Sequence, residues 1–269
     1  MERRTFLTSI LGTAALAGVR PSGANAEQGM TSSGSPEFYV WRQYVMRNGT
    51  EMRRVADFLQ NAAIPALNRL GHKPIGVFEV VAGVPTPTLF TLTPIPSLDR
   101  LATLDSSLEA DEQFMKTGAA YIDAPATDMP YVRQEVSLLA AFPKMPHLEV
   151  PGATATKGPR LFELRTYENP TEKAQRAKMR MFSEMGEIEI FKRVGLTPVF
   201  FSRTLIGPHM PSIVYMLVHE NMAGREKSWS NFSGDPEWQK VRATPGCSDA
   251  DIVSNITTVF LRPAAYSQI

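Results

Sequence analysis

Residues 161–167 read LFELRTY, and residues 38–44 read FYVWRQY. Both stretches are rich in aromatic and aliphatic residues and alternate between two faces, as a half-buried β-strand does. After the later stretch, Asn169 and Pro170 provide a helix N-cap and a first-turn proline. Apolar residues then recur with a helical period as far as Gly195, a residue type that commonly ends helices. The sequence therefore predicts a strand followed by a helix, and a related strand occurs earlier in the chain.

The similarity extends well beyond these two strands. An offset of 124 residues holds without a gap through the middle of the repeat, and it later superposes residues 111–114 (DEQF) on residues 235–238 (DPEW). The identical pairs are Ile64 with Ile188, Arg69 with Arg193, Gly71 with Gly195, Pro74 with Pro198, Gly83 with Gly207 and Pro87 with Pro211. Average composition would give far fewer matches over so short a stretch. The sequence therefore predicts an internal duplication.

Each copy is predicted to run strand, helix, strand, strand, helix, strand, which is the order of a ferredoxin-like unit. The second copy places these elements near 161–167, 169–195, 198–206, 212–219, 224–232 and 252–261, and the first near 38–44, 50–70, 74–81, 88–93, 98–108 and 131–142. Such a unit leaves one sheet face bare, and two units can bury these faces against each other. The predicted fold is α+β: units at 37–142 and 160–263, joined by a Pro/Gly-rich linker at 143–159, form a dimeric α/β-barrel-type fold within one chain.

The first 26 residues are typical of a targeting segment. Arg3 and Arg4 precede a moderately apolar run, and residues 24–26 (ANA) supply the small side chains that a signal peptidase requires. The arginine pair favours export by the twin-arginine route, with an ordinary secretory signal and a retained membrane anchor as alternatives. We therefore expect a periplasmic or secreted protein that contacts the membrane only through an uncleaved signal, with a flexible leader over residues 27–36.

The composition excludes several classes of protein. Of 269 residues, 43% are hydrophobic and 20% are charged, with a net charge of +1, which fits a globular domain and not a dedicated nucleic-acid binder. The single cysteine, Cys247, cannot form an intramolecular disulfide, and the four histidines lack the spacing of metal ligands. We therefore expect no bound metal and no nucleic-acid partner.

The second copy resembles the NIPSNAP family. The resemblance lies in residues 162–167 (FELRTY), in residues 191–195 (FKRVG) at the predicted end of the first helix, and in Trp229 with residues 235–238. The first copy is weaker, because residues 40–44 read VWRQY where the signature reads ELRTY. The resemblance implies a dimeric α/β-barrel fold and leaves a homodimer open. It implies no particular activity, because no catalytic residue is agreed for the family.

Alternation along the strands sorts their residues into two faces. We expect Tyr39, Trp41, Phe162 and Leu164 to pack under the helices, and the opposite face to line the barrel. The polar residues expected in that lining are Arg42, Tyr44, Glu79, Glu163, Arg165, Tyr167 and Arg203. Charged groups inside a barrel must be paired or solvated, so their partners decide what the lining does.

This lining has two interpretations. In the functional one, the arginines hold an anionic or carbonyl-bearing ligand, while Tyr167 or Glu163 exchanges a proton with it. In the structural one, the charges form internal pairs, Glu163 with Arg165 and Glu79 with Arg203.

Two further features are candidates for function. His219 ends a predicted strand and is a candidate proton shuttle or haem ligand, or simply a strand-end residue. The stretch Lys116–Pro130 has no close counterpart in the second copy, which makes Tyr121 and Asp123 candidate lid residues.

The leading hypothesis is an exported NIPSNAP-like protein that binds a small organic ligand in an α/β barrel. Its pocket would lie between sheet and helices or between the units, and relatives with this barrel suggest cofactor-independent oxygenation or isomerisation. Haem is the one cofactor left open, and whether the protein is an enzyme is undecided. The alternative is a non-catalytic interaction or scaffold module. Binding predicts an open cavity reached by Arg165 or Tyr167, and a scaffold predicts a filled barrel with an exposed apolar patch.

Overall fold

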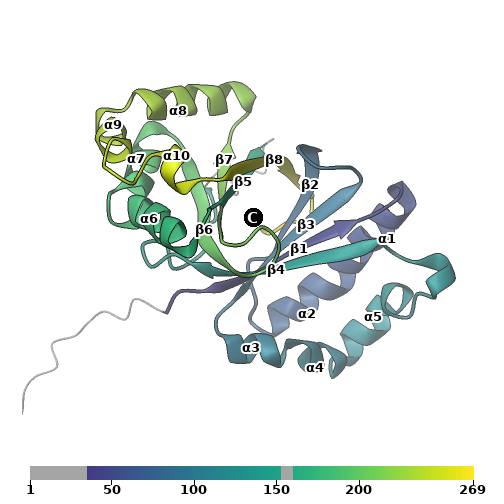
Figure 1. The fold of residues 1–269 in the computed structure, drawn as a ribbon. Helices are drawn as coiled ribbons and strands as arrows, with labels where there is room; N and C mark the ends of the chain where they lie inside the picture. The colour runs from purple at the N-terminus through teal and green to yellow at the C-terminus, as the bar shows by residue number, and fades with distance from the viewer. Residues whose placement is uncertain (1–34, 153–159) are drawn as a thin grey trace, which may run out of the picture. The chain divides into compact units, whose positions relative to one another are not determined.

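The computed structural model describes residues 35–152 and 160–269 (Figure 1). The expected signal segment, most of the expected leader and residues 153–159 of the expected linker lie outside the described residues. Within the described ranges, no helix is both long enough and apolar enough to cross a membrane.

Eight antiparallel strands close into a barrel in the order β1-β3-β2-β8-β5-β7-β6-β4. The strands are β1 (Phe38–Val45), β2 (Gly76–Ala82), β3 (Thr88–Ile95), β4 (Arg133–Ala141), β5 (Leu161–Glu168), β6 (Thr197–Ile206), β7 (Ser212–His219) and β8 (Asn255–Pro263). Each repeat supplies four neighbouring strands, and the two sets join through β2–β8 and β4–β6 pairing, with a register irregularity at each junction. Such irregularities add the local bending that closure requires. The predicted α+β barrel within one chain is confirmed.

Helices cover the outside of the barrel. The first repeat has α1 (Gly49–Phe58), the π-helix η1 (Leu59–Ala63), α2 (Ile64–Arg69), α3 (Leu98–Ala102), α4 (Leu104–Glu109), α5 (Glu112–Ile122) and the 3₁₀-helix η2 (Ala126–Asp128). The second has α6 (Glu172–Ser183), α7 (Glu187–Val194), α8 (Met222–Gly234), α9 (Pro236–Arg242) and α10 (Asp249–Ile252). The single helix predicted over 169–195 is divided, because Gly186 has a φ of 83°, a left-handed conformation that interrupts a right-handed helix.

An ion pair that occurs once in each repeat confirms that the offset of 124 residues joins equivalent positions. Asp111 caps α5 and lies 2.6 Å from Arg69, while Asp235 caps α9 and lies 2.7 Å from Arg193. Both ion pairs hold the later helix against the end of the earlier one. Residues at this offset can therefore be compared directly.

The interior of the barrel is an apolar core, which reverses the predicted orientation of the strands. Tyr39, Trp41, Phe162 and Leu164 are buried in a cluster to which all eight strands contribute, and Ile269 joins them. A hollow of about 140 Å³ is lined in part by Trp41 of this cluster. The expected barrel lining was therefore wrong for Arg42, Tyr44, Glu79, Glu163, Arg165, Tyr167 and Arg203. Strands enclose the barrel interior on every side, so a charge there would lose its water, whereas gaps between helices keep some access to solvent.

Candidate functional site

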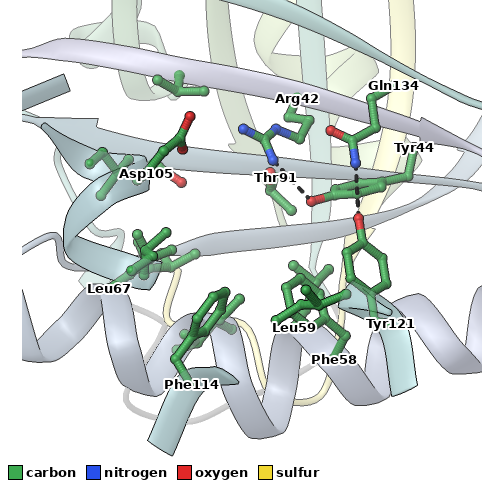
Figure 2. A pocket seen from close by; sticks show the side chains of 18 of the residues that line it. Arg42, Tyr44, Phe58, Leu59, Leu67, Thr91, Asp105, Phe114, Tyr121 and Gln134 are labelled. Atoms are coloured by element: carbon green, nitrogen blue, oxygen red, sulfur yellow. Dashed lines mark hydrogen bonds between the residues drawn. The ribbon is translucent and has the colours of Figure 1, made fainter. Parts of the chain in front are cut away.

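A cavity of about 530 Å³ lies between the sheet and the helices of the first repeat. Figure 2 shows strands on one side of it and helices on the other. The helices provide an apolar wall of Phe58, Leu59, Leu67 and Phe114, of which Leu59 belongs to the π-helix η1. The polar lining consists of Arg42, Tyr44, Thr91, Thr93, Asp105, Glu109, Tyr121, Tyr131 and Gln134. A largely apolar cavity of this size with a few polar groups is typical of small-molecule sites.

The cavity exists because β3 presents small side chains to the helices. Thr91 and Thr93 line it, whereas the residues 124 positions later are Tyr215 and Leu217. Tyr215 is fully buried in the second repeat, and its ring centroid lies 4.8 Å from that of Phe201. The same space between sheet and helices is thus open in the first repeat and filled by side chains in the second.

Arg42 is the only basic residue in the described lining of the cavity. Its Nη1 lies 3.5 Å from the Tyr44 hydroxyl, and no ion pair with a carboxylate is recorded for it among residues 35–152 and 160–269. Burial disfavours its charge, but Tyr44, Tyr121 and Asp105 outweigh burial and raise the pKa of Arg42 above its ordinary value. The cavity therefore contains a charged guanidinium with no carboxylate partner among the described residues.

Aromatic hydroxyls form the part of the lining next to Arg42. Gln134 Nε2 donates a hydrogen bond of 2.9 Å to the Tyr121 hydroxyl, and the Tyr121 ring stacks on Phe58 at 3.8 Å between centroids. The Tyr44 and Tyr131 rings meet edge to face at 5.9 Å. Burial, and then the neighbouring Tyr44 and Tyr131, raise the pKa of Tyr121 above its ordinary value. Tyr121 is therefore neutral at physiological pH and keeps a proton to donate.

Carboxylates occupy the helix side of the cavity. Asp105 and Glu109 both belong to α4, both line the cavity, and both are solvent-exposed residues. In Figure 2, the Asp105 and Arg42 side chains both lie above the helix wall that carries Phe114 and Leu59, and Arg42 comes from β1. The two charges thus line one cavity from different elements.

A buried carboxylate organises the second repeat instead. Glu163 is fully buried and lies 2.9 Å from His219 Nε2, and it accepts hydrogen bonds from Arg225 at 2.7 and 3.0 Å and from Trp229 Nε1 at 2.9 Å. Arg165 Nη1 lies 3.3 Å from the same carboxylate. Burial alone would raise the pKa of Glu163, but the hydrogen bonds from His219, Arg225 and Trp229 outweigh it and lower the pKa to about 2. Glu163 is therefore charged and fully paired at neutral pH.

Arg165 corresponds to Arg42 in the repeat and is surrounded by partners. Besides Glu163, it donates a hydrogen bond of 3.0 Å to the Tyr167 hydroxyl, and its Cζ lies 4.5 Å from the Trp229 ring centroid. The Tyr215 hydroxyl lies 3.4 Å from that of Tyr167. The pair of Glu163 with Arg165 that the structural interpretation expected is confirmed.

The three candidates for proton transfer meet in this packed network and not in the cavity. Tyr167 is linked through Arg165 to Glu163, which contacts His219. The His219 side chain is 1% exposed and its Nε2 is engaged with Glu163, so this residue does not fit the role of a haem ligand. No cluster of three or more His, Cys, Asp or Glu side chains suited to a metal ion occurs within the described part of the chain.

Two of the expected ligand-binding residues lie elsewhere on the barrel. Glu79 pairs with Arg262 of β8 at 2.5 Å, and Arg203 is exposed on β6. The expected pair of Glu79 with Arg203 is wrong, because β2 and β6 are not neighbours in the barrel. Of the five expected ligand-binding residues, Arg42 and Tyr44 line the cavity.

Several lining residues were missed by sequence reasoning, namely Asp105, Gln134 and Tyr131. Tyr121, a candidate lid residue, does line the cavity, whereas Asp123 is absent from the described lining. Helix α5 carries Tyr121 and exceeds its counterpart α9 by four residues, since these helices have 11 and 7. A signal was present: at the offset of 124, residue 91 is threonine where residue 215 is tyrosine.

A comparison with protein-family models finds a match in the second half of the chain. Residues 162–268 match the NIPSNAP family model, so the resemblance predicted for the second copy is confirmed. A search of the curated proteins finds no match.

Two similar solved structures cover most of both repeats. A "putative monooxygenase" from Lactobacillus acidophilus NCFM has 10% identity and a TM-score of 0.54 over 85% of this chain and 94% of its own. Another, from Fusobacterium nucleatum, has 7% identity and a TM-score of 0.52 over 85% and 93%. At this identity the likeness shows the fold. An uncharacterized NIPSNAP-like domain protein from Burkholderia xenovorans is 21% identical, with a TM-score of 0.34 over 41% of this chain and 90% of its own.

Proposed function

With the NIPSNAP domain of the second half as the premise, we propose that the protein binds a small organic molecule in the cavity of the first repeat. The ligand has an anionic or carbonyl oxygen, which accepts hydrogen bonds from Arg42. Its body is largely apolar and packs against Phe58, Leu67 and Phe114. The observation that carries the proposal is Arg42, a charged group that faces an open cavity with no carboxylate partner recorded among the described residues.

The free-energy cost of partly burying the charged guanidinium of Arg42 supports this assignment. Removing a charge from water is costly unless an anion or several hydrogen-bond acceptors replace the solvent. For Arg165 that acceptor is Glu163. The first strands of the two repeats, residues 38–44 and 161–167, align at an offset of 123 residues, so the counterpart of Glu163 is Val40, which offers no acceptor. A ligand oxygen would accept a hydrogen bond from Arg42, as the Glu163 carboxylate does from Arg165.

A reaction on this ligand belongs to the same proposal. Oxygenation by molecular oxygen, or isomerisation, in either case without a cofactor, is the chemistry that we propose for an enzyme with this site. Glu163 and His219 lie outside the cavity, so Tyr121 would act as a hydrogen-bond donor to the reacting oxygen, because its raised pKa keeps the hydroxyl neutral.

Binding can be measured with 8-anilinonaphthalene-1-sulfonate, an aromatic anion that fluoresces when it leaves water. We expect saturable binding to the full chain, at least tenfold weaker binding to Arg42→Gln, and unchanged binding to Arg203→Gln. The control removes the same charge from an exposed position outside the described lining. Equal affinity of Arg42→Gln and the wild type would refute the role of Arg42.

Native mass spectrometry of the protein from its own host separates this proposal from the scaffold alternative. An adduct of a few hundred daltons that disappears in Arg42→Gln would support a bound ligand. A bare mass would favour the interaction module, which the filled interior of the barrel also fits.

Export is a separate part of the proposal and depends on residues outside the described range. We propose that the twin-arginine route carries the chain to the periplasm or beyond. Replacing Arg3 and Arg4 together by lysine should retain the protein in the cytoplasmic fraction. Unchanged export of that variant would point to the ordinary secretory route.

A further inference from the structure

The lining of the cavity carries two opposite charges that are not paired with each other. Arg42 projects from β1, and Asp105 belongs to α4 (Figure 2). No ion pair between them is recorded in the described part of the chain, although their mutual attraction contributes to the raised pKa of Arg42. A ligand in the cavity can therefore interact with both charges.

The second repeat shows why these two charges are left unpaired. Ser97 and Asn221 cap equivalent helices at the offset of 124, and the same offset makes Trp229 the counterpart of Asp105. Trp229 covers Arg165 and donates a hydrogen bond to Glu163. In the second repeat the carboxylate thus comes from the strand and touches the arginine. In the first repeat it comes from the helix and stands apart from the arginine.

We propose that the cavity selects flat aromatic compounds with an anionic or carbonyl oxygen at one end and a hydrogen-bond donor, such as a phenolic hydroxyl, at the other. This inference rests on the proposed function and adds a second recognition point. Arg42 would bind the oxygen, and Asp105 would accept a hydrogen bond from the hydroxyl. The ring would lie against the apolar wall that includes Leu59 and Phe114.

Charge supports a donor at the α4 end of the ligand. Asp105 and Glu109 place two carboxylates on that helix, and an anionic group beside them would be repelled. A neutral hydroxyl keeps its hydrogen bond to a carboxylate without the cost of removing a second charge from water. Ligands with one negative charge are therefore favoured over those with two.

Two fluorescent probes test the inference, 2-naphthoate and 6-hydroxy-2-naphthoate. They share a ring system and a carboxylate, and only the second has a hydroxyl at the far end. We expect the wild-type full chain to bind the hydroxylated probe about tenfold more tightly, which is the effect of one charge-assisted hydrogen bond. Asp105→Asn should abolish that preference and should strengthen the binding of 2-naphthoate, because a repelling charge is removed.

Asp123→Asn is the matched control, since it removes a carboxylate from the same repeat but from outside the described lining. It should keep the tenfold preference. Equal binding of both probes by the wild type, or a preference that survives Asp105→Asn, would overturn this inference and leave the proposed function intact. Binding of neither probe by the wild type would count against both. Loss of both probes in Arg42→Gln would support the proposed function separately.

Discussion

The two repeats share one fold and use the space between sheet and helices in opposite ways. In the first repeat, threonines on β3 leave a cavity in which Arg42 has no carboxylate partner among the described residues. In the second, Tyr215 fills the space and Glu163 pairs with Arg165. The arginine is present in both, and its surroundings differ. A duplicated unit can thus keep its architecture while one copy becomes a packed support and the other remains open to a ligand.

The difference concerns stability as well as binding. The second repeat has a continuous aromatic core in which Phe191, Phe201 and Tyr215 contact one another. The first repeat lacks the corresponding aromatic packing where its cavity lies. Variants that exchange features between the repeats therefore test the comparison directly.

The largest effect is expected from Glu163→Gln. The change leaves Arg225 and Arg165 without the carboxylate that both contact. Breaking a buried charge network in this way costs about 3–5 kcal/mol of the free energy of unfolding. Chemical denaturation measures the loss. Glu79→Gln, which breaks the more exposed pair with Arg262, should cost less than about 1 kcal/mol; similar losses in both variants would contradict the assigned role.

Tyr215→Thr should open in the second repeat the space that Thr91 leaves in the first. Loss of a fully buried aromatic ring should lower the free energy of unfolding by about 3 kcal/mol. The reciprocal Thr91→Tyr should abolish probe binding in the first repeat with little loss of stability, because its ring occupies existing space. Retained binding in Thr91→Tyr would show that the probe sits elsewhere.

Acid should weaken the second repeat through Glu163. Its pKa in the folded protein is about 2, below the ordinary value of 4.5. The stabilisation is therefore complete above pH 4.5 and is lost as the pH falls toward 2, by about 3 kcal/mol in total. The difference in free energy of unfolding between wild type and Glu163→Gln should shrink across that window. A difference that stays constant would contradict the lowered pKa.

Val40→Glu should make the first repeat resemble the second in charge. It places a carboxylate at the position equivalent to Glu163, where it can pair with Arg42. We expect the affinity for an anionic probe to fall about tenfold, or ~1.4 kcal/mol, because the arginine is neutralised. Titration of the fluorescent probe measures this. Val40→Gln, which has the same shape without the charge, should weaken binding less, and equal effects would point to crowding.

Much of the fold could be read from the sequence because local rules and the repeat agree. Period-2 strands, a capped helix after Asn169 and the offset of 124 specify two ferredoxin-like units. The orientation of the strands was wrong, however. Alternation separates two faces but does not say which one turns inward, and the aromatic face of Tyr39 and Phe162 forms the interior. The aromatic face was expected to pack under the helices, which left the charged face for the interior.

The candidate site was found only in part for a related reason. Arg42 and Tyr44 were expected to bind a ligand and do line the cavity. Glu163 was expected to act with them, yet it belongs to the packed repeat. Asp105 was missed because nothing in the sequence distinguishes an acidic residue that lines a cavity from one on any exposed helix surface.

The sequence by itself determined the duplication, the order of the elements and the α+β class, because these depend on local periodicity and on similarity between two stretches. Only the tertiary structure decided which sheet face closes the barrel and which repeat keeps an open cavity. Those outcomes depend on side-chain volume at contacts between residues far apart in the chain. The difference between Thr91 and Tyr215 determines whether a cavity forms only once the helices pack on β3 and β7.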